Sequence, residues 1–323
     1  MADDIAVRLE GGLGDHLLGM RLLHFIRLRY PQHKIIVYSD CGGFRTQLQI
    51  SAMSPYVDEV IPIFTRREKV TEGNMGSLEN IRTEDLEKIR RAHIFIDGWP
   101  GPVFVPPKKT LNPGSLYIPH SRELRVPHHV ILASRPKLEI PSSYRNKAND
   151  ILGSSPGRKF VAINFEKYTP DGLRRNFGRL KKLLLDILES APSTYILNIF
   201  SRNVDFPHWP ELGCIERCRQ SVALADAHEE MCGWHERILP IVNEDIQTVA
   251  PLLERCHYFI GVDNGIKHLA WALDIPRTVL LPFQPPREFI LRWMPDYDRA
   301  VAINKRETVP FCLAPGSEHV YQA

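Results

Sequence analysis

Short apolar runs alternate with longer segments in which apolar residues recur at helical spacing, and this pattern covers most of the chain. The first apolar run, IAVRLE at 5–10, precedes a segment at 17–28 with a wide apolar stripe of helical period. Strands that alternate with helices are typical of a parallel sheet wrapped by helices. Further strands of the first half are predicted at 34–40, 59–64 and 93–100, with a charged helix at 83–92.

The alternation starts again in the second half. Nine prolines between positions 100 and 141 interrupt regular structure, and the polar stretch at 141–160 is the predicted domain boundary. We therefore expect two doubly wound, Rossmann-like α/β domains, 1–150 and 158–323, which face each other across a ligand-binding cleft. Predicted strands of the second domain are 160–165, 194–200, 237–242, 257–263 and 278–283, and predicted helices are 180–190, 244–256 and 265–274.

Composition places the chain among soluble globular proteins, because 43% of its 323 residues are hydrophobic and 24% are charged. No stretch reaches the roughly 18 to 20 apolar residues of a membrane span, and the N-terminal residues do not have the pattern of a signal peptide. We expect a cytoplasmic protein with reduced cysteines. A net charge of +3 does not favour a nucleic-acid partner, although the slightly basic first half suits an anionic one.

The turn after the first predicted strand, GGLGDHLLG, combines glycines with one carboxylate, Asp15. Its spacing departs from the GxGxxG pattern, and a carboxylate at a helix start would repel a phosphate. Asp15 is compatible with a helix cap, in which case Gly12 and Gly14 only allow a tight turn. Alternatively, the glycines keep the turn open to a substrate, and Asp15 faces the cleft as a general base.

A second turn of interest lies in HYFIGVDNGIKHLAWALDIP, residues 257–276. A buried strand is predicted to end at Asp263, and Gly265 opens a helix whose first turn contains Lys267 and His268. Such a helix start directs backbone N–H groups and a cation toward one point, as a diphosphate requires. The alternative is structural, with Asp263 as a cap and His268 as a packed histidine.

This second segment resembles the "DSG…HLAAALG.P" signature of the ADP-heptose-dependent heptosyltransferases, a family of inverting glycosyltransferases with the two-domain GT-B fold. Three further segments resemble that family in the same order along most of the chain. They are GGLGDHLL, SPYVDEVIPI and HIFIDG.

The resemblance implies a role for each matching residue. Asp15 would deprotonate the acceptor hydroxyl, in a turn that includes Gly12, Gly14 and His16. A basic residue after the first strand of the second domain is also implied, and Arg175 fits that position best, with Lys167 as a further donor contact. The remaining implied donor-binding residues are Asp263, Asn264, Gly265, Lys267 and His268.

Two departures from the family concern the donor. Asn264 stands where the family commonly has Ser or Thr, and Lys267 replaces a residue that is often Met or Leu. The family's glycine-and-glutamate pattern after the second strand of this domain is absent from NIFSRNVDFPHW. We transfer no donor-sugar contact from that segment.

The resemblance implies an inverting transfer of a heptose-like sugar from an ADP-heptose-like nucleotide sugar to an acceptor hydroxyl, with no cofactor or metal required. The acceptor would bind the first domain, and a glycan or another anionic acceptor would suit it. The alternatives are another donor with an unusual acceptor, such as a protein, an antibiotic scaffold or modified DNA, or a non-catalytic nucleotide-sugar-binding protein. One possible structural metal site is suggested by spacing alone and comprises Cys214, Cys218, Cys232 and His235.

Overall fold

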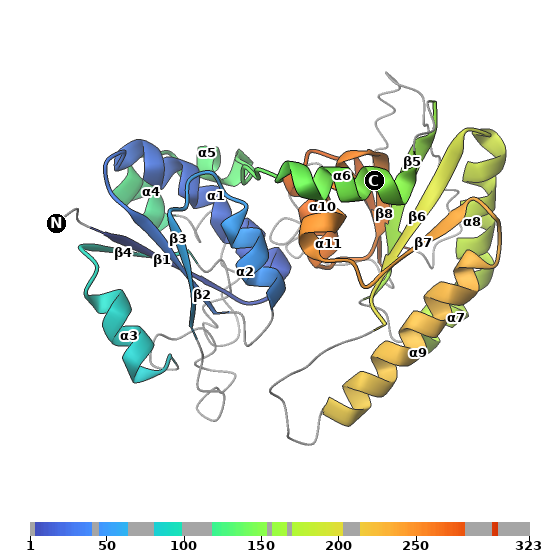
Figure 1. Ribbon diagram of the computed structural model, residues 1–323, viewed down its shortest axis with the longest axis horizontal. Helices are drawn as coiled ribbons and strands as arrows, with labels where there is room; N and C mark the ends of the chain where they lie inside the picture. The colour runs from blue at the N-terminus through green and yellow to red at the C-terminus, as the bar shows by residue number, and fades with distance from the viewer. Residues whose placement is uncertain are drawn as a thin grey trace.

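The computed structural model describes residues 4–40, 45–63, 81–98, 118–153, 157–166, 170–202, 214–281 and 299–302. The strands of these residues form two parallel sheets side by side (Figure 1). The first sheet has four strands in the order β3-β2-β1-β4, and the second has six in the order β10-β9-β8-β5-β6-β7. The prediction of two Rossmann-like α/β units is confirmed.

The first unit, β1 to α5, is called the first lobe below. Its sheet buries apolar residues on both faces, as expected for strands covered by helices. Helices α1 and α2 cover the face toward the second sheet, and α3 covers the other face (Figure 1). Its elements are β1 (Ile5–Glu10), α1 (Leu13–Arg29), β2 (Ile35–Asp40), α2 (Arg45–Ala52), β3 (Glu59–Ile63), α3 (Thr83–Arg90), β4 (Ile94–Asp97), α4 (Ile118–Leu124) and α5 (His128–Ala133).

The second lobe runs from β5 to β10. Helices α10 and α11 lie on the face toward the first lobe, whereas α7, α8 and α9 cover the opposite face (Figure 1). Its elements are β5 (Lys159–Asn164), α7 (Pro170–Arg175), α8 (Phe177–Ser190), β6 (Thr194–Phe200), α9 (Cys214–Cys232), β7 (Ile238–Val242), α10 (Ile246–Glu254), β8 (Cys256–Gly261), α11 (Gly265–Ala272), β9 (Arg277–Leu281) and β10 (Arg299–Ala302).

The polar stretch predicted as the domain boundary contains a helix, α6 (Ser142–Leu152). This helix packs against α10 of the second lobe. Arg145 Nη2 lies 2.9 Å from Glu254 Oε1, and Lys147 Nζ lies 2.6 Å from Glu244 Oε2. The connection between the lobes is thus attached to the second lobe along its length.

The two lobes share one hydrophobic core. Helix α1 packs on α11 and α2 on α10, and a single cluster of buried apolar residues continues from the first sheet to the second. Within this contact the guanidinium of Arg21 lies 4.7 Å from the centre of the Trp271 ring. Arg21 comes from α1 and Trp271 from α11, and both side chains are buried. This cation–π contact therefore lies in the interface between the lobes.

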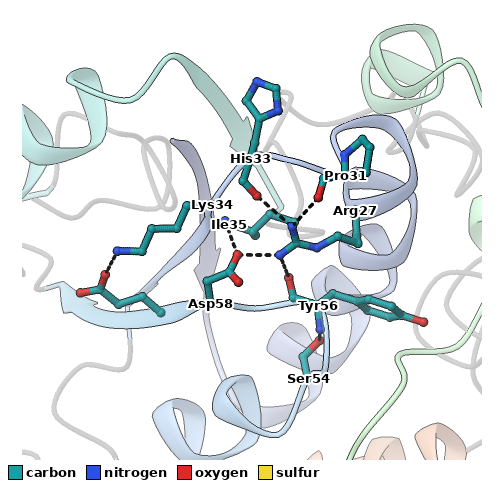
Figure 2. A network of polar contacts seen from close by, with 9 residues as sticks. Arg27, Pro31, His33, Lys34, Ile35, Ser54, Tyr56 and Asp58 are labelled. Atoms are coloured by element: carbon teal, nitrogen blue, oxygen red, sulfur yellow. Dashed lines mark hydrogen bonds and ion pairs between the residues drawn. The ribbon is translucent and has the colours of Figure 1, made fainter. Parts of the chain in front are cut away.

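A polar network at the amino end of β2 fixes the end of α1 (Figure 2). Arg27 donates to the carbonyl oxygens of His33 at 2.8 Å and Tyr56 at 3.0 Å, and to the Asp58 carboxylate at 2.5 Å. Partial burial acts to raise the pKa of Asp58, but hydrogen bonds from the Ile35 N–H and from Arg27 hold that pKa below its ordinary value. This network lies at the opposite end of the sheet from the turn that contains Asp15.

Candidate active site between the lobes

The first turn of α1 brings Asp15 to the carboxyl end of β1. Gly12 is the N-cap residue, and its N–H donates to Asp15 Oδ2 at 2.9 Å in a capping box. Asp15 itself is half-buried. The carboxylate therefore caps the helix from three residues inside it, and the residue remains partly exposed.

Gly11 is a site residue that the sequence analysis missed. Its φ of +92° lies in the left-handed region, and a Cβ at this position would lie 2.6 Å from Asp15 Oδ2. Only glycine combines this backbone with the space that the carboxylate needs. The run of glycines before Asp15 was the available signal.

His16 is fully buried and points into the first lobe. Its Nε2 lies 2.8 Å from Ser39 Oγ, and its Nδ1 lies 3.2 Å from the carbonyl oxygen of Gly12. Burial lowers the pKa of His16 to about 4, against the smaller raising effect of the Gly12 hydrogen bond, so the ring is neutral at physiological pH. This position allows His16 to hold the turn, but not to contact an acceptor directly.

The first turn of α11 is capped by Asn264, whose side chain accepts from the Lys267 N–H at 3.1 Å. Lys267 is fully buried, and its Nζ lies 3.0 Å from Asp263 Oδ1. His268 Nε2 lies 3.7 Å from the same oxygen. The charge of Lys267 is therefore compensated by Asp263 inside the protein, and Asn264, rather than Asp263, is the cap.

The starts of α1 and α11 are in contact. A Cβ on Gly14 would lie 2.5 Å from His268 Cδ2, and a Cβ on Gly265 would lie 2.8 Å from Leu13 Cβ. Each glycine thus leaves space for a side chain of the other lobe. Asp15 is the next residue of this first turn of α1.

A cavity of about 370 Å³ lies beside this junction. The first lobe contributes Leu13 and Thr46, and the second lobe contributes the rest of its wall. Among the described residues that line it, none is Lys or Arg. The polar lining residues are Thr46, Glu166, Ser201, Glu244 and Asn264, and the others are Leu13, Ile199, Phe200, Ile241, Ile246, Val249, Gly265 and Ile266.

Arg175, the predicted basic residue, ends α7 and is exposed. Its Nε donates to the carbonyl oxygen of Asp171 at 3.2 Å, and it does not line the cavity. Lys167 lies outside the described residues. The structure therefore brings the turn that contains Asp15 into contact with the start of α11, through Gly14 and Leu13, but does not bring Arg175 to that contact.

The metal site suggested by cysteine spacing is incompatible with the geometry of α9. Cys214 and Cys232 are the two ends of α9, a helix of 19 residues. At 1.5 Å per residue these ends lie about 27 Å apart, too far to share one ion. Cys218 and His235 therefore cannot complete a four-ligand site with both of them.

Comparison with known proteins supports the resemblance found in the motifs. The family model described as glycosyltransferase family 9 (heptosyltransferase) matches residues 221–289, which include the α11 turn. No curated protein sequence matches the chain.

Two solved structures share the fold. A glycosyl transferase family 9 protein from Veillonella parvula is 16% identical, with a TM-score of 0.57 over 93% of this chain and 87% of that one. The ADP-heptose lipopolysaccharide heptosyltransferase II of E. coli is 14% identical, with a TM-score of 0.54 over 92% and 90%. The chain thus has the GT-B fold of the heptosyltransferases, and its α9-to-α11 region matches glycosyltransferase family 9.

Proposed function

We propose that the protein is an inverting glycosyltransferase that moves a heptose-like sugar from a nucleoside-diphosphate sugar to an acceptor hydroxyl. The observation that carries this proposal is the junction between the lobes, where the turn of Asp15 meets the start of α11 beside a cavity. An acid on one lobe and a helix N-terminus on the other are the two elements that a sugar transfer requires. The family match supports the same reaction class.

In the proposed reaction, Asp15 accepts the proton of the acceptor hydroxyl while the oxygen of that hydroxyl attacks the anomeric carbon of the donor sugar. The bond from that carbon to the diphosphate oxygen breaks in the same step, and the configuration inverts. The leaving diphosphate takes the bonding electron pair. Backbone N–H groups and the positive end of α11 would stabilise its charge in place of a metal ion.

The capping hydrogen bond makes Asp15→Asn a clean test, because an asparagine oxygen can still accept from the Gly12 N–H. Loss of the base should lower kcat by about 10²- to 10⁴-fold. Transfer and hydrolysis are measured with a panel of nucleoside-diphosphate sugars, of which ADP-heptose is the first. Asp186→Asn, on the exposed surface of α8, is the matched control and should leave kcat unchanged.

Two outcomes would contradict the proposal. Equal kcat in Asp15→Asn and the parent protein would remove Asp15 from the reaction. Binding of nucleotide sugars without transfer or hydrolysis, in the presence of candidate acceptors, would favour a non-catalytic binding protein. Activity with a donor other than ADP-heptose would keep the reaction class and change only the donor.

A further inference from the structure

The turn that presents Asp15 is formed by glycines, which restrain it little. Gly11 has a φ of +92°, and Gly12 is extended, with φ −78° and ψ −179°. Glycine loses more conformational freedom on folding than any other residue. Because the Gly12 N–H donates to Asp15 Oδ2 at 2.9 Å, the orientation of the carboxylate depends on how firmly Gly12 is held.

His16 holds Gly12 through two hydrogen bonds. The Gly12 carbonyl oxygen accepts from the His16 N–H at 3.1 Å, which is the ordinary helical bond, and the ring nitrogen Nδ1 of His16 lies 3.2 Å from the same oxygen. The second bond is not part of the helix and depends on the side chain alone. The residue that follows Asp15 thus anchors the residue that donates to Asp15.

Ser39 fixes the ring of His16. The Ser39 Oγ lies 2.8 Å from His16 Nε2, and both side chains are fully buried. Burial lowers the pKa of His16 to about 4, so the ring is neutral and only one of its nitrogens carries a hydrogen. A carbonyl oxygen can only accept, so this hydrogen is on Nδ1, and Nε2 accepts from the Ser39 hydroxyl.

Ser39 is a rigid attachment point because it belongs to a strand inside the sheet. It lies near the carboxyl end of β2, where Leu9 of β1 is its partner on one side and Pro62 of β3 on the other. The hydrogen bonds therefore run from the sheet through the His16 ring to Gly12.

A buried polar pair at this place is not what packing alone favours. Leu17 and Met20 of the same helix are buried as apolar side chains of the shared core. Taking a hydroxyl and an imidazole out of water is unfavourable unless each finds a hydrogen-bond partner, whereas apolar residues need none. The pair of His16 and Ser39 therefore points to a role in the site.

We propose that His16 is a positioning residue for the general base: held by Ser39, it fixes Gly12 and thereby directs the Asp15 carboxylate toward the acceptor hydroxyl. This inference rests on the proposed function, in which Asp15 accepts the proton of that hydroxyl. His16 acts through Gly12 and does not touch the substrates. Loss of its ring should slow the transfer without changing how the substrates bind.

His16→Leu removes both ring bonds and keeps a buried apolar side chain. Its kcat should fall by about 10- to 100-fold, because a misplacement of about 1 Å can cost about 10²-fold, and its KM for the donor should stay within about 2-fold of the parent value. The donor is the sugar nucleotide of the panel above that the parent protein transfers or hydrolyses. His24→Leu is the matched control and should keep the parent kcat, since His24 is half-buried about two turns further along α1, beside Tyr56.

Two conservative variants separate the bonds of the ring. In His16→Asn the amide nitrogen takes the place of Nδ1 and still donates to the Gly12 carbonyl oxygen, so most of kcat should be retained. In His16→Gln the amide nitrogen takes the place of Nε2, which reaches Ser39 but not Gly12. Its kcat should fall as in His16→Leu, and the opposite order of these two variants would overturn the inference.

A double variant distinguishes positioning from general damage to the site. If His16 acts through the carboxylate, adding His16→Leu to Asp15→Asn should change kcat by about 2-fold or less. A loss as large as that in the parent protein would show that His16 does not act through Asp15.

The outcomes also keep this inference apart from the proposed function. If Asp15→Asn loses activity but His16→Leu and His16→Gln do not, the positioning role is wrong and the proposed function stands. If Asp15→Asn keeps the parent kcat, both are wrong. Circular dichroism melting confirms that each variant is folded. Ser39→Ala, which keeps the ring, carries the test if His16→Leu does not fold: its kcat should fall by about 5-fold, the equivalent of one neutral hydrogen bond, and an unchanged kcat would overturn the inference.

Discussion

At the scale of single residues, the glycine of α1 that faces the second lobe is a specific constraint. A Cβ on Gly14 would lie 2.5 Å from the His268 ring. Alanine normally stabilises a helix by about 0.5–1 kcal/mol relative to glycine, but forcing a methyl group into a packed contact costs about 1–3 kcal/mol. The clash should dominate, so Gly14→Ala is expected to lower the melting temperature and to weaken nucleotide binding.

Gly178→Ala is the matched control for that prediction. A Cβ on Gly178 would meet no atom within 4 Å, so this change in α8 should leave the melting temperature unchanged or raise it slightly. A melting temperature that rises equally in both variants would show that the contact between Gly14 and His268 does not limit the approach of the lobes.

Two buried histidines give the folded protein a defined pH dependence. Burial lowers the pKa of His16 and of His228 to about 4, whereas an unfolded histidine titrates near 6.5. Between these values the unfolded chain binds more protons than the folded protein. The free energy of unfolding therefore has its full value above about pH 6.5 and decreases as the pH falls toward 4. Each histidine should contribute a loss of about 3 kcal/mol in the free energy of unfolding.

Urea unfolding at several pH values between 4 and 7 measures this effect. His228 is stacked between Phe165 and Phe200, and His228→Gln should reduce the slope of stability against pH. The exposed His257 provides the control, since His257→Gln should retain the parent slope. An identical slope in the parent protein, His228→Gln and His257→Gln would contradict a contribution of His228 to the pH dependence.

The sequence allowed some site residues to be identified and not others, for a physical reason. Asp15 and the turn of 263–268 follow directly after apolar strands, so their position at the carboxyl edge of a sheet could be predicted. Glu166 also follows a strand, but its orientation in the cavity wall depends on hydrogen bonds from Asn164 and from the Ser201 N–H beside it. The burial of Lys267 beside Asp263 likewise depends on tertiary packing and left no local signal.

At the scale of secondary structure, all nine strands predicted from apolar runs are present, and each pairs with a neighbour in a parallel sheet. Six of the described helices were not predicted, among them α6 and α9. The apolar positions of α6 are few and are hidden among polar residues, although Ala148 and Leu152 are buried against α10. In α9, Leu224, Ala227 and Met231 are buried at helical spacing, but polar residues between them hide this pattern in the sequence.

The attachment of α6 leads to a prediction about which of its contacts matters. Leu152 is 3% exposed and belongs to the shared core, whereas Arg145 forms an exposed ion pair with Glu254. Leu152→Ala should destabilise the protein by about 2–5 kcal/mol, and Arg145→Ala by about 1 kcal/mol or less. Chemical denaturation of both variants checks this order, and a larger effect of Arg145→Ala would mean that ion pairs hold α6 in place.

At the scale of the whole molecule, the shared core predicts that the two lobes unfold together. The buried cluster that contains Leu17 and Met20 of α1 continues to Leu269 and Ala270 of α11. Exposure of one lobe would therefore expose apolar surface of the other. Urea transitions followed by far-ultraviolet circular dichroism and by tryptophan fluorescence should coincide, and two separate transitions would show independent lobes.

Across the part of the chain that the structure describes, none of the helices has both the length and the apolar character that crossing a bilayer requires. The junction between the lobes is a separate feature of the whole molecule: both lobes line the cavity, and the turn of Asp15 contacts α11 through Gly14.

The contact of Gly14 with His268 and of Gly265 with Leu13 also limits how such a protein can be rebuilt. A chimera that joins this first lobe to the second lobe of a relative would bring together two helix starts that were never matched to each other. Chimeras in which the first turns of α1 and α11 are transplanted as a pair should fold, whereas those that exchange only one turn should not. Recombination within this fold would therefore be expected to preserve the pair.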